Sequence, residues 1–430
     1  MKKMRKRILM ATFGSLGDIH PYLAVAIGLK ERGHEVTLAT CEMYRSKIER
    51  EGVRFHPIRP DIASVYDHPE PMRQALKENT GTEYTLCQVL LPHLEESYED
   101  LLRACRGKDL LVSHTLTFAL PPVAEKLKLP WVSIALQPLI FLSAHDPPVL
   151  SADKRPFRLH RLSRWKFMLL FDLTKQHTRP WMKPVDELRR RLGLAPAAGH
   201  PLFEGKFSPH GSLAWFSPLI AGPRPDWPAH TRVTGFPFYD EQRSGSGLDS
   251  RLTEFLERGE PPVVFTLGSL GLIEASDYFD QSVMAAKRLG CRAILLTGAQ
   301  TSGRLRTSLP DEIIVREYAP YSAVFPHAAA VVHHGGIGTT GQALRAGRPM
   351  LVVPFVDDQL DNAVRARNLG VARVVDTRSY TAKRAQAELT RLLSESSYSS
   401  RAADIGQAIR NEDGVGAACD ALDALSSVSV

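Results

Sequence analysis

The stretch His333-His334-Gly335-Gly336-Ile337-Gly338-Thr339-Thr340 determines how the rest of the chain is interpreted. It follows an apolar run, residues 328–332, that is typical of a buried strand, and it precedes residues 342–346, which are typical of the beginning of a helix. A turn between a strand and a helix presents free backbone N–H groups at the positive end of the helix dipole. Glycines let a bulky phosphate approach that backbone closely. The stretch therefore predicts an anion-binding site.

The length and composition indicate a globular protein with two domains. A chain of 430 residues exceeds what one ordinary core supports. Apolar residues make up 43% and charged residues 23%, which argues against disorder. The cysteines are scattered without close pairs, which suits a reducing cytosol and gives no zinc or disulfide pattern; they are Cys41, Cys87, Cys105, Cys291 and Cys419.

The basic N-terminus is interpreted as a solvated tail before a buried strand, and not as a signal peptide. The apolar run after it, residues 8–13, is short and ends in Gly14 and Asp18, so a charge stands where a signal peptide would continue apolar. No stretch is long enough to span a bilayer. These features predict a cytoplasmic protein.

The net charge of +7 is concentrated in residues 153–191, where lysines and arginines far outnumber acidic residues. Two interpretations stay open. The favoured one is a solvated helical face with an apolar inner side. The other is peripheral contact with the anionic inner face of the membrane, because aromatic residues are interleaved with the basic ones. Nucleic acid is disfavoured because no recognised binding motif accompanies the charge. The aromatic residues concerned are Phe157, Trp165, Phe167, Phe171 and Trp181.

Strand and helix patterns alternate along the first half, which predicts an α/β fold with a parallel sheet covered on both faces. The Pro- and Gly-rich stretch 196–237 interrupts this alternation, although residues 232–235 could still form a strand. The expected strands are 7–13, 35–40, 53–57, 110–113 and 131–135, and the expected helices are 21–32, 43–51, 83–105 and 118–127.

The second half starts the alternation again after a polar, glycine-containing segment that is typical of a linker. The predicted organisation is an N-terminal domain over 1–238, a linker over 239–247 and a C-terminal domain over 248–403, with a helical pattern at 404–426 that packs back on the first domain. Two such domains face each other across a cleft, with ligands at the carboxyl ends of their strands. The expected strands are 262–267, 293–297, 313–316, 330–333 and 350–353, and the expected helices are 278–289, 342–346, 360–369 and 382–394.

Neither a G-x-G-x-x-G after the first strand nor a P-loop motif occurs, which disfavours a nicotinamide dehydrogenase or a P-loop enzyme. The loop from Gly14 to Pro21 instead places two proton carriers, Asp18 and His20, before the first expected helix. On local grounds Asp18 is equally well explained as a helix N-cap.

Three further features follow expected strands. Gly268 and Ser269 form either a phosphate-contacting turn or an ordinary tight turn. Tyr318 either stacks on a planar base or packs in a core. Asp358 and Gln359 either hydrogen-bond sugar hydroxyls or cap a helix. No metal site is predicted, since adjacent histidines on a strand face opposite ways.

Taken together, these motifs resemble the nucleotide-sugar-dependent glycosyltransferases of the GT-B fold. The most specific part of the resemblance is residues 318–359. The opening loop 14–21 and residues 331–340 look most like the bacterial branch that includes glycopeptide and macrolide glycosyltransferases, and the wider family includes plant and sterol glucosyltransferases. The segment around 67–69 is similar to the rhamnosyltransferases of rhamnolipid synthesis.

The resemblance implies a nucleotide-sugar donor site in the C-terminal domain. His334 and the first turn after it would hold the diphosphate, Tyr318 would stack on uracil or thymine, and Asp358 and Gln359 would hold the sugar. Gln342 stands where plant members have a glutamate for the ribose. The implied donor-site residues are Ser15, Gly268, Ser269, Tyr318, Tyr321, His334, Gly336, Gly338, Thr339, Thr340, Gln342, Asp358 and Gln359.

The resemblance also implies an inverting transfer without cofactor or metal. Asp18 occupies the position of the catalytic base, either alone or helped by His20 or His114. The acceptor would be a lipophilic molecule with a hydroxyl, bound by the N-terminal domain. UDP-glucose and dTDP-rhamnose both stay open as donors, and a monomer or weak homodimer is expected. The alternative is a non-catalytic nucleotide-binding protein that activates or scaffolds a partner enzyme. The expected acceptor residues are Phe118, Trp131, Phe141, Trp165 and Phe171.

Overall fold

The chain divides into two compact units in the computed structural model. The first unit combines Met1–Tyr239 with Asp413–Val430, and the second unit is Asp240–Glu412. The structure describes residues 5–62, 69–77, 80–152, 155–158, 163–240, 248–268, 275–298, 309–356 and 358–425.

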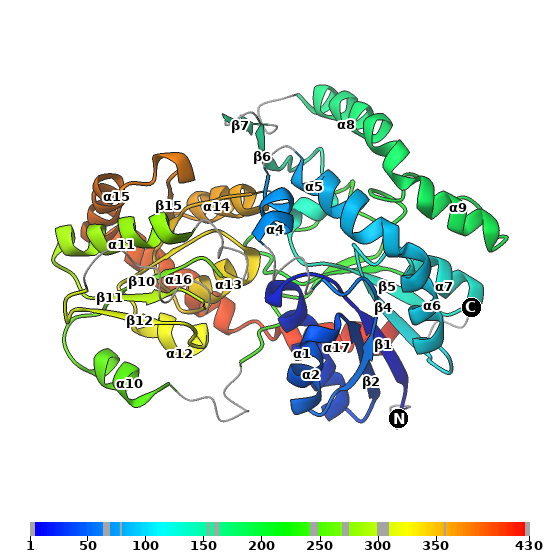
Figure 1. Ribbon diagram of the computed structural model, residues 1–430, viewed down its shortest axis with the longest axis horizontal. Coiled ribbons are helices and arrows are strands. Elements are labelled where there is room, and N and C mark those ends of the chain that lie inside the picture. The colour runs from blue at the N-terminus through cyan, green and yellow to red at the C-terminus, as the bar shows by residue number, and fades with distance from the viewer. Residues whose placement is uncertain are drawn as a thin grey trace. The chain divides into compact units, whose positions relative to one another are not determined.

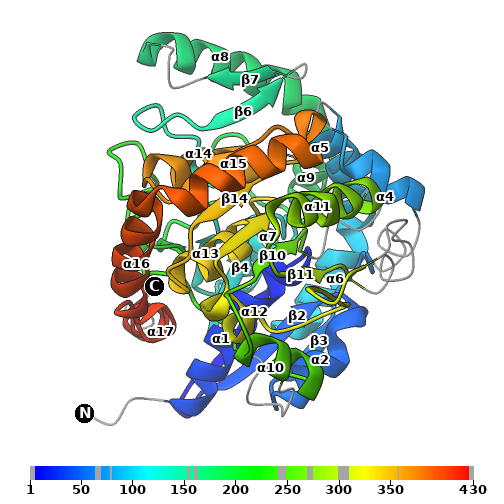
Figure 2. The ribbon, with the colours of Figure 1, turned by 90° about the vertical axis from the view of Figure 1, so that its left-hand side faces the viewer.

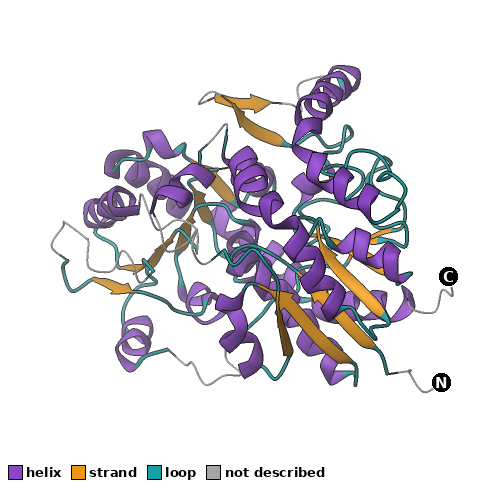
Figure 3. Ribbon diagram, turned by 45° about the vertical axis from the view of Figure 1, so that its right-hand side comes forward, coloured by secondary structure: helices purple, strands orange, loops and turns teal. Residues whose placement is uncertain are grey.

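Within its described residues, the first unit is built on a parallel sheet of seven strands in the order β3-β2-β1-β4-β5-β8-β9. The central strands are apolar on both faces because helices cover both sides of the sheet (Figures 1 and 3). The strands are β1 (Arg7–Ala11), β2 (Glu35–Thr40), β3 (Arg54–Pro57), β4 (Leu110–His114), β5 (Trp131–Ala135), β8 (Ser212–Ala214) and β9 (Thr231–Val233).

The helices of the first unit are α1 (Leu16–Glu31), α2 (Arg45–Arg50), α4 (Pro69–Ala75), α5 (Gly81–Tyr84), α6 (Leu94–Ala104), α7 (Leu120–Leu127), α8 (Arg164–Thr178), α9 (Lys183–Arg191) and α17 (Gly414–Leu425). Shorter turns are η1 (Glu42–Tyr44), η2 (Thr85–Leu90), η3 (Leu91–His93), η4 (Pro138–Phe141) and η6 (Arg179–Met182), and an antiparallel hairpin joins β6 (Val149–Ala152) to β7 (Arg155–Arg158).

The predicted continuous helix over 83–105 is wrong. The chain passes from α5 through a π-helical turn and a 3-10 turn before α6 begins at Leu94. Pro92 lies in the 3-10 turn, and proline has no N–H for a helical hydrogen bond and crowds the preceding turn. The amphipathic pattern was therefore correct for α6 alone.

The second unit has its own parallel sheet (Figure 2). In the described residues this sheet contains six strands in the order β12-β11-β10-β13-β14-β15. These are β10 (Val263–Thr266), β11 (Ala293–Leu296), β12 (Ile313–Arg316), β13 (Ala330–His333), β14 (Met350–Val352) and β15 (Ala372–Val374). The helices are α10 (Ser250–Glu257), α11 (Ala275–Leu289), α12 (Tyr321–Val324), α13 (Ile337–Arg345), α14 (Asp358–Asn368), α15 (Ala382–Ser394) and α16 (Ser396–Arg410), with turns η8 (Phe325–His327) and η9 (Thr377–Ser379).

The helical pattern predicted over 404–426 is divided between the two units. Helix α16 packs on α13 in the second unit, whereas α17 packs on α1 in the first. The packing of α17 is close, because a Cβ at Gly414 would collide with the Phe236 carbonyl and a Cβ at Gly28 would lie 2.7 Å from Val415. Most of the predicted linker, residues 241–247, lies outside the described residues.

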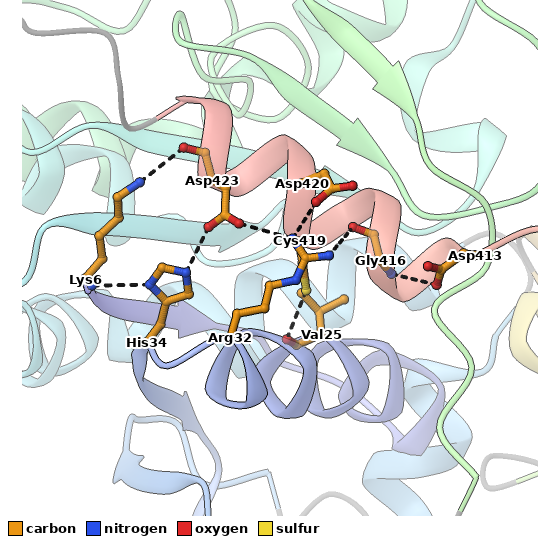
Figure 4. Close-up of polar contacts among 9 residues, drawn as sticks. All are labelled: Lys6, Val25, Arg32, His34, Asp413, Gly416, Cys419, Asp420 and Asp423. Carbon is orange, nitrogen blue, oxygen red and sulfur yellow. Dashed lines mark hydrogen bonds and ion pairs between the residues drawn. The ribbon is translucent and has the colours of Figure 1, made fainter. Parts of the chain in front are cut away.

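Polar contacts fix α17 beside α1 (Figure 4). The Asp423 carboxylate lies 2.9 Å from His34 Nε2 and 3.1 Å from the Arg32 guanidinium. Arg32 also reaches Asp420 and donates to the Gly416 carbonyl. Residues almost 400 positions apart in the sequence are thus tied into one unit.

Candidate active site

Helix α1 of the first unit begins directly after β1, earlier than predicted. Its first residue is Leu16 and its N-cap is Ser15, so Asp18 and His20 lie inside the first turns and not before the helix. Ser15 Oγ accepts from the Gly17 N–H, and the Ser15 N–H donates to Asp18 Oδ2 at 2.8 Å. This reciprocal arrangement is a capping box, which places the helix start at Ser15.

The second oxygen of the Asp18 carboxyl group faces a histidine. Asp18 Oδ1 lies 3.6 Å from Nε2 of His114, the last residue of β4, and this separation is longer than a hydrogen bond. His114 Nδ1 accepts from the Leu116 N–H, which assigns the ring proton to Nε2 on the side of Asp18. One strand end and one helix start therefore bring a carboxylate and an imidazole together.

Burial changes the ionisation of both groups. It raises the pKa of Asp18 to about 6, while the hydrogen bonds from Ser15 act in the opposite direction. The side chain of Asp18 nevertheless remains 30% exposed. Burial, assisted by the nearby Lys206 ammonium, lowers the pKa of His114 to about 3. At neutral pH the pair is a carboxylate beside a neutral imidazole.

The turn at residues 333–340, for which an anion site is predicted, joins a strand to a helix in the second unit as expected. Helix α13 begins at Ile337 after the N-cap Gly336, and Thr340 donates the first helical bond to the Gly336 carbonyl at 2.9 Å. The backbone N–H groups of residues 337–339 therefore lie at the open, positive end of the helix. The start of α13 is earlier than the predicted 342.

The His334 imidazole is enclosed by two glycines beside this helix end. A Cβ at Gly336 would collide with the ring, and a Cβ at Gly268 would lie 2.6 Å from its Cε1. His334 Nδ1 is buried and has no hydrogen-bond partner among the residues that the structure describes. Burial lowers the pKa of His334 to about 4, so the ring is neutral and can donate one hydrogen bond.

His333 has a separate, structural position. Its Nδ1 accepts from the Gly335 N–H at 3.1 Å and its Nε2 lies 3.2 Å from the Met350 sulfur, so its ring is fully engaged. The two histidine rings lie at 83° to each other. Across the described residues, no group of three or more His, Cys, Asp or Glu side chains is placed to hold a metal ion.

Comparisons with known proteins agree with this geometry. Residues 8–91 match the glycosyltransferase family 28 N-terminal domain, and residues 284–413 match the erythromycin biosynthesis protein CIII-like C-terminal domain. The chain is 32% identical to O-mycaminosyltylonolide 6-deoxyallosyltransferase of Streptomyces fradiae over 423 residues, covering 96% of each protein. The chain is a GT-B glycosyltransferase of this family.

Two further relatives extend the comparison. The glycosyltransferase is 29% identical to a sterol 3-beta-glucosyltransferase of Arabidopsis thaliana, covering 97% of this chain and 68% of that protein. Its fold matches the crystal structure of the glycosyltransferase VinC in complex with dTDP, with a TM-score of 0.69, 22% identity and coverage of 98% and 99% of the two chains. The predicted GT-B architecture is confirmed.

Several predicted donor residues of the glycosyltransferase also hold the protein together. Tyr321 stacks on Phe325 with ring centroids 4.4 Å apart, and its hydroxyl lies 2.9 Å from Thr266 Oγ1. The Thr340 hydroxyl donates to the Gly336 carbonyl. Gln359 Oε1 accepts from the backbone N–H groups of residues 355 and 356. By contrast, Tyr318 is 54% exposed.

Asn362 is a functional candidate that sequence reasoning missed. Its Nδ2 donates to the Gly335 carbonyl at 3.0 Å and to Asp358 Oδ2 at 2.9 Å, which joins the glycine turn to the beginning of α14. A Cβ at Gly335, where φ is +96°, would lie 2.7 Å from the Gln359 carbonyl. The spacing of four residues between Asp358 and Asn362 on a helix was the available signal.

The other predicted donor residues are less constrained. Gly338 is exposed, and Thr339 and Gln342 lie on the first two turns of α13, buried and half-buried respectively. Ser269, Asp357 and the segment 63–68 lie outside the described residues. Ser15 belongs to the capping box of α1, and His20 packs its ring 4.9 Å from Tyr239.

The five predicted acceptor residues occupy different environments. Trp131 lies in the buried strand β5, and Phe141 stacks on Trp227 with centroids 4.1 Å apart, so both are core residues. Phe171 packs edge-on against Phe203 and Trp165 is 63% exposed, both on α8. Only Phe118, among these five, lines a pocket beside His114.

That pocket, here called the His114 pocket, lies at the carboxyl end of β4. The loop from β4 to α7, helix α9 and the segment 197–206 enclose it. Its walls are largely apolar, but two basic side chains reach it. Its lining includes Ser113, His114, Phe118, Val185, Arg189 and Lys206.

Proposed function

We propose that this glycosyltransferase transfers a hexose or deoxyhexose from a nucleoside-diphosphate sugar to a hydroxyl of a lipophilic small-molecule acceptor, with inversion. The observation that carries the proposal is the Asp18 carboxylate in the first turn of α1, held by Ser15 through one oxygen while the other faces His114. The names of the relatives support it: one transfers a deoxyallosyl group, one glucosylates sterols, and VinC binds dTDP.

The proposed base is Asp18. An acceptor hydroxyl has a pKa far above neutrality, so it becomes a nucleophile only when a base removes its proton as the new bond forms. A positioned general base typically contributes about 10²–10⁴-fold to the rate. With a pKa of about 6, Asp18 is ionised at neutral pH and still accepts the proton readily. His114 stays neutral, and its Nε2 lies 3.6 Å from the carboxylate.

The proposed leaving-group site is the beginning of α13. The acceptor oxygen bonds to the anomeric carbon while the bond from that carbon to the phosphate oxygen breaks. The departing nucleoside diphosphate takes the electron pair, and Asp18 takes the proton. The N–H groups of residues 337–339 and a hydrogen bond from neutral His334 stabilise the growing phosphate charge, each preorganised donor being worth roughly 3 kcal/mol. This set of donors needs no metal ion.

A donor screen tests the function. The purified protein is incubated with UDP-glucose, dTDP-rhamnose and related nucleotide sugars against mixed phenolic, macrolide and sterol alcohols, and products are identified by mass spectrometry. We expect transfer from at least one donor, with Asp18→Asn reducing kcat while leaving binding of the nucleoside diphosphate unchanged. No transfer from any donor, with nucleotide binding intact, would favour the non-catalytic alternative instead.

We also propose that helix α8 contacts an anionic membrane peripherally. In Figure 1 it lies apart from the sheet of its unit. Its inner face packs through Phe167 and Phe171, whereas the opposite face carries an apolar stripe that is 49–63% exposed. Arg164 and Lys166 flank the beginning of this stripe, a charge pattern that suits anionic headgroups. The stripe consists of Trp165, Met168, Leu169 and Leu173. The described part of the chain contains no helix able to cross a membrane.

Vesicle sedimentation tests this contact. Vesicles containing phosphatidylserine should bind the protein, and Leu169→Glu should abolish binding because it places a charge in the apolar stripe. Met284→Glu on α11 is the matched control, since Met284 is also exposed but lies outside the stripe. Equal binding by both variants, or no binding to anionic vesicles by the unaltered protein, contradicts the membrane contact.

A further inference from the structure

The His114 pocket contains a positive charge that the proposed mechanism does not use. Lys206 lines the pocket, and its ammonium lies close enough to His114 to depress the ionisation of that ring. Among the described residues it has no hydrogen bond and no ion pair. The Nζ atom of Lys206 lies 5.3 Å from the centroid of the Phe207 ring. Burial lowers the pKa of Lys206 to about 8, so the side chain is largely protonated at neutral pH.

The acidic groups around the pocket are already paired with other bases. Glu204 attracts Lys206 electrostatically but binds Lys175 at 2.6 Å and accepts from the His200 N–H. Glu125 forms a bidentate ion pair with Arg189, with N–O distances of 2.9 and 2.7 Å. Arg189 also donates to the Ala195 carbonyl at 2.7 Å, so each nitrogen of its guanidinium already has a partner.

Lys206 is half-buried, and a cation in such a place without an ion-pair partner is unfavourable, because the protein replaces part of its water without restoring an opposite charge. Proteins generally pair such a group or use it for a ligand. Here the remaining walls are apolar and include Phe118, Pro122 and Val185. An occupant of the pocket would therefore combine an apolar body with one negative charge.

We propose that Lys206 binds a carboxylate of the acceptor, so that the natural acceptor is a hydroxy acid and not a neutral alcohol. The inference rests on the proposed function, because it identifies the His114 pocket as part of the acceptor site. The hydroxyl of such an acceptor lies on the His114 side of the pocket, towards Asp18, while the carboxylate pairs with Lys206. A carboxylate is preferred to a phosphate because one ammonium neutralises one charge.

Pairs of acceptors that differ only in charge test the proposal. The probes are ricinoleate and para-coumarate, each compared with its methyl ester at pH 7, where Lys206 is protonated. We expect the acids to have the higher kcat/KM. Lys206→Met should lower kcat/KM for the acids about 10–100-fold, the range for a hydrogen bond to a charged group, and leave the esters unchanged. Lys206→Arg should retain part of the preference because it keeps the charge.

A matched control and a binding measurement make the result unambiguous. Lys183→Met removes an exposed lysine at the beginning of α9 that does not line the pocket, and it should not change the ratio between acid and ester. Calorimetric binding of the same four compounds requires no sugar transfer. Preferential binding of the acids that Lys206→Met abolishes supports the proposal even if no donor is found, in which case only the proposed function fails.

Three outcomes overturn the proposal. The first is equal kcat/KM and equal affinity for acid and ester in the unaltered protein. The second is a loss in Lys206→Met that is the same for acids and esters, which would indicate a general effect on the fold or on His114. The third is that none of the four compounds binds. Thermal unfolding of Lys206→Met and Lys206→Arg shows whether either variant is folded.

Discussion

Asp18 combines two properties that the sequence presented as alternatives. Its Oδ2 completes the capping box of α1 with Ser15, and its Oδ1 remains directed at His114. The carboxyl group has two oxygens, so helix capping and proton transfer do not exclude each other. Gly14, with φ of +127°, makes the arrangement possible, because a Cβ there would collide with the Asp18 carboxylate.

The pKa of Asp18 predicts the acid limb of the pH profile. The base acts in its ionised form, so kcat/KM should fall about tenfold per pH unit below pH 6 and level off above it. Asp18→Asn should lower kcat by about 10²–10⁴-fold and abolish this limb. Steady-state kinetics between about pH 5 and pH 8 measure both effects, because this interval extends to both sides of the pKa of Asp18. A limb that persists in Asp18→Asn would assign the titration to another group.

The raised pKa of Asp18 also makes the stability of the protein depend on pH, in the direction opposite to that of the activity. An aspartate whose pKa rises from its ordinary value of about 3.9 to about 6 on folding binds protons more tightly in the folded state. Its contribution to the free energy of unfolding is therefore greatest at low pH and is lost as the pH rises through about 6. Asp18→Asn should remove this dependence, provided the amide still accepts from Ser15.

Two glycines of the anion site should respond differently to alanine. Gly336→Ala forces a Cβ into the His334 ring and should weaken binding of UDP or dTDP more than tenfold, together with a lower Tm. Gly338→Ala meets no protein atom within 4 Å, so its Tm should stay unchanged. Weaker nucleotide binding by Gly338→Ala would then report contact between the ligand and the helix end. Calorimetry and thermal unfolding give both values, and a drop in Tm for Gly338→Ala would contradict this account.

Individual site residues could be predicted where they are consecutive in the sequence. They could not be predicted where residues that are far apart in the sequence come together. The turn at 333–340 predicted an anion site from consecutive residues, and its geometry follows. Lys206 was missed because 92 positions separate it from His114, and no local pattern signals a pocket formed by β4 and the segment 197–206. The roles given to the predicted donor and acceptor residues stay predictions.

Among the secondary-structure elements, the strands were predicted better than the helix boundaries. Buried parallel strands are continuous apolar runs, so β5, β12 and β13 begin and end as expected. Helices α1 and α13 begin earlier than expected, because Gly-rich first turns have low helix propensity and only their capping residues mark the start. Strand β8 was missed because it is three residues long within a Pro- and Gly-rich stretch.

Helix α8 corrects the favoured interpretation of the basic segment. The sequence favoured a solvated outer face with apolar residues inside. The structure shows apolar residues on both sides, with Phe167 buried and Leu169 exposed only two positions later. Helical periodicity places these residues on opposite faces of α8, but the number of apolar residues alone did not show that one of the two faces is exposed.

The contact between α17 and α1 predicts a difference between two aspartates. Asp423 is 12% exposed and contacts both His34 and Arg32, whereas Asp420 is 70% exposed. Asp423→Ala should lower the free energy of unfolding of the first unit by roughly 2 kcal/mol, since it leaves the buried His34 ring without an acceptor. Asp420→Ala should change it by less than about 0.5 kcal/mol. Denaturant unfolding followed by tryptophan fluorescence compares them, and equal losses would contradict the burial argument.

For the whole molecule, the two-sheet α/β architecture was fully predictable from alternating strand and helix patterns, and the family comparison confirms it. The two compact units meet between Tyr239 and Asp240. The sequence did not show that α16 and α17 belong to different units. Their patterns are continuous, and only the short interruption around residues 411–413 separates them.

A chelator distinguishes the proposed charge stabilisation from metal catalysis. If the helix end and His334 stabilise the diphosphate, activity should be essentially unchanged after dialysis against excess EDTA, with kcat within about twofold. The loss of one donor, at roughly 3 kcal/mol, would reduce kcat far more than this. The assay uses metal-free buffers, and enzyme readmitted to Mg²⁺ or Mn²⁺ serves as the control. Complete loss of activity that a single divalent ion restores would contradict the mechanism.

The docking of α17 on α1 also has a consequence for biosynthesis. The second unit is continuous in sequence, so all of its residues are synthesised before α17. The first unit starts earlier but lacks the helix that covers α1 until residue 425 has left the exit tunnel. During that interval the apolar surface around Gly28 stays uncovered, and nascent chains should be most prone to aggregation and chaperone binding there. The order of synthesis is therefore the reverse of the order in which the two units become complete.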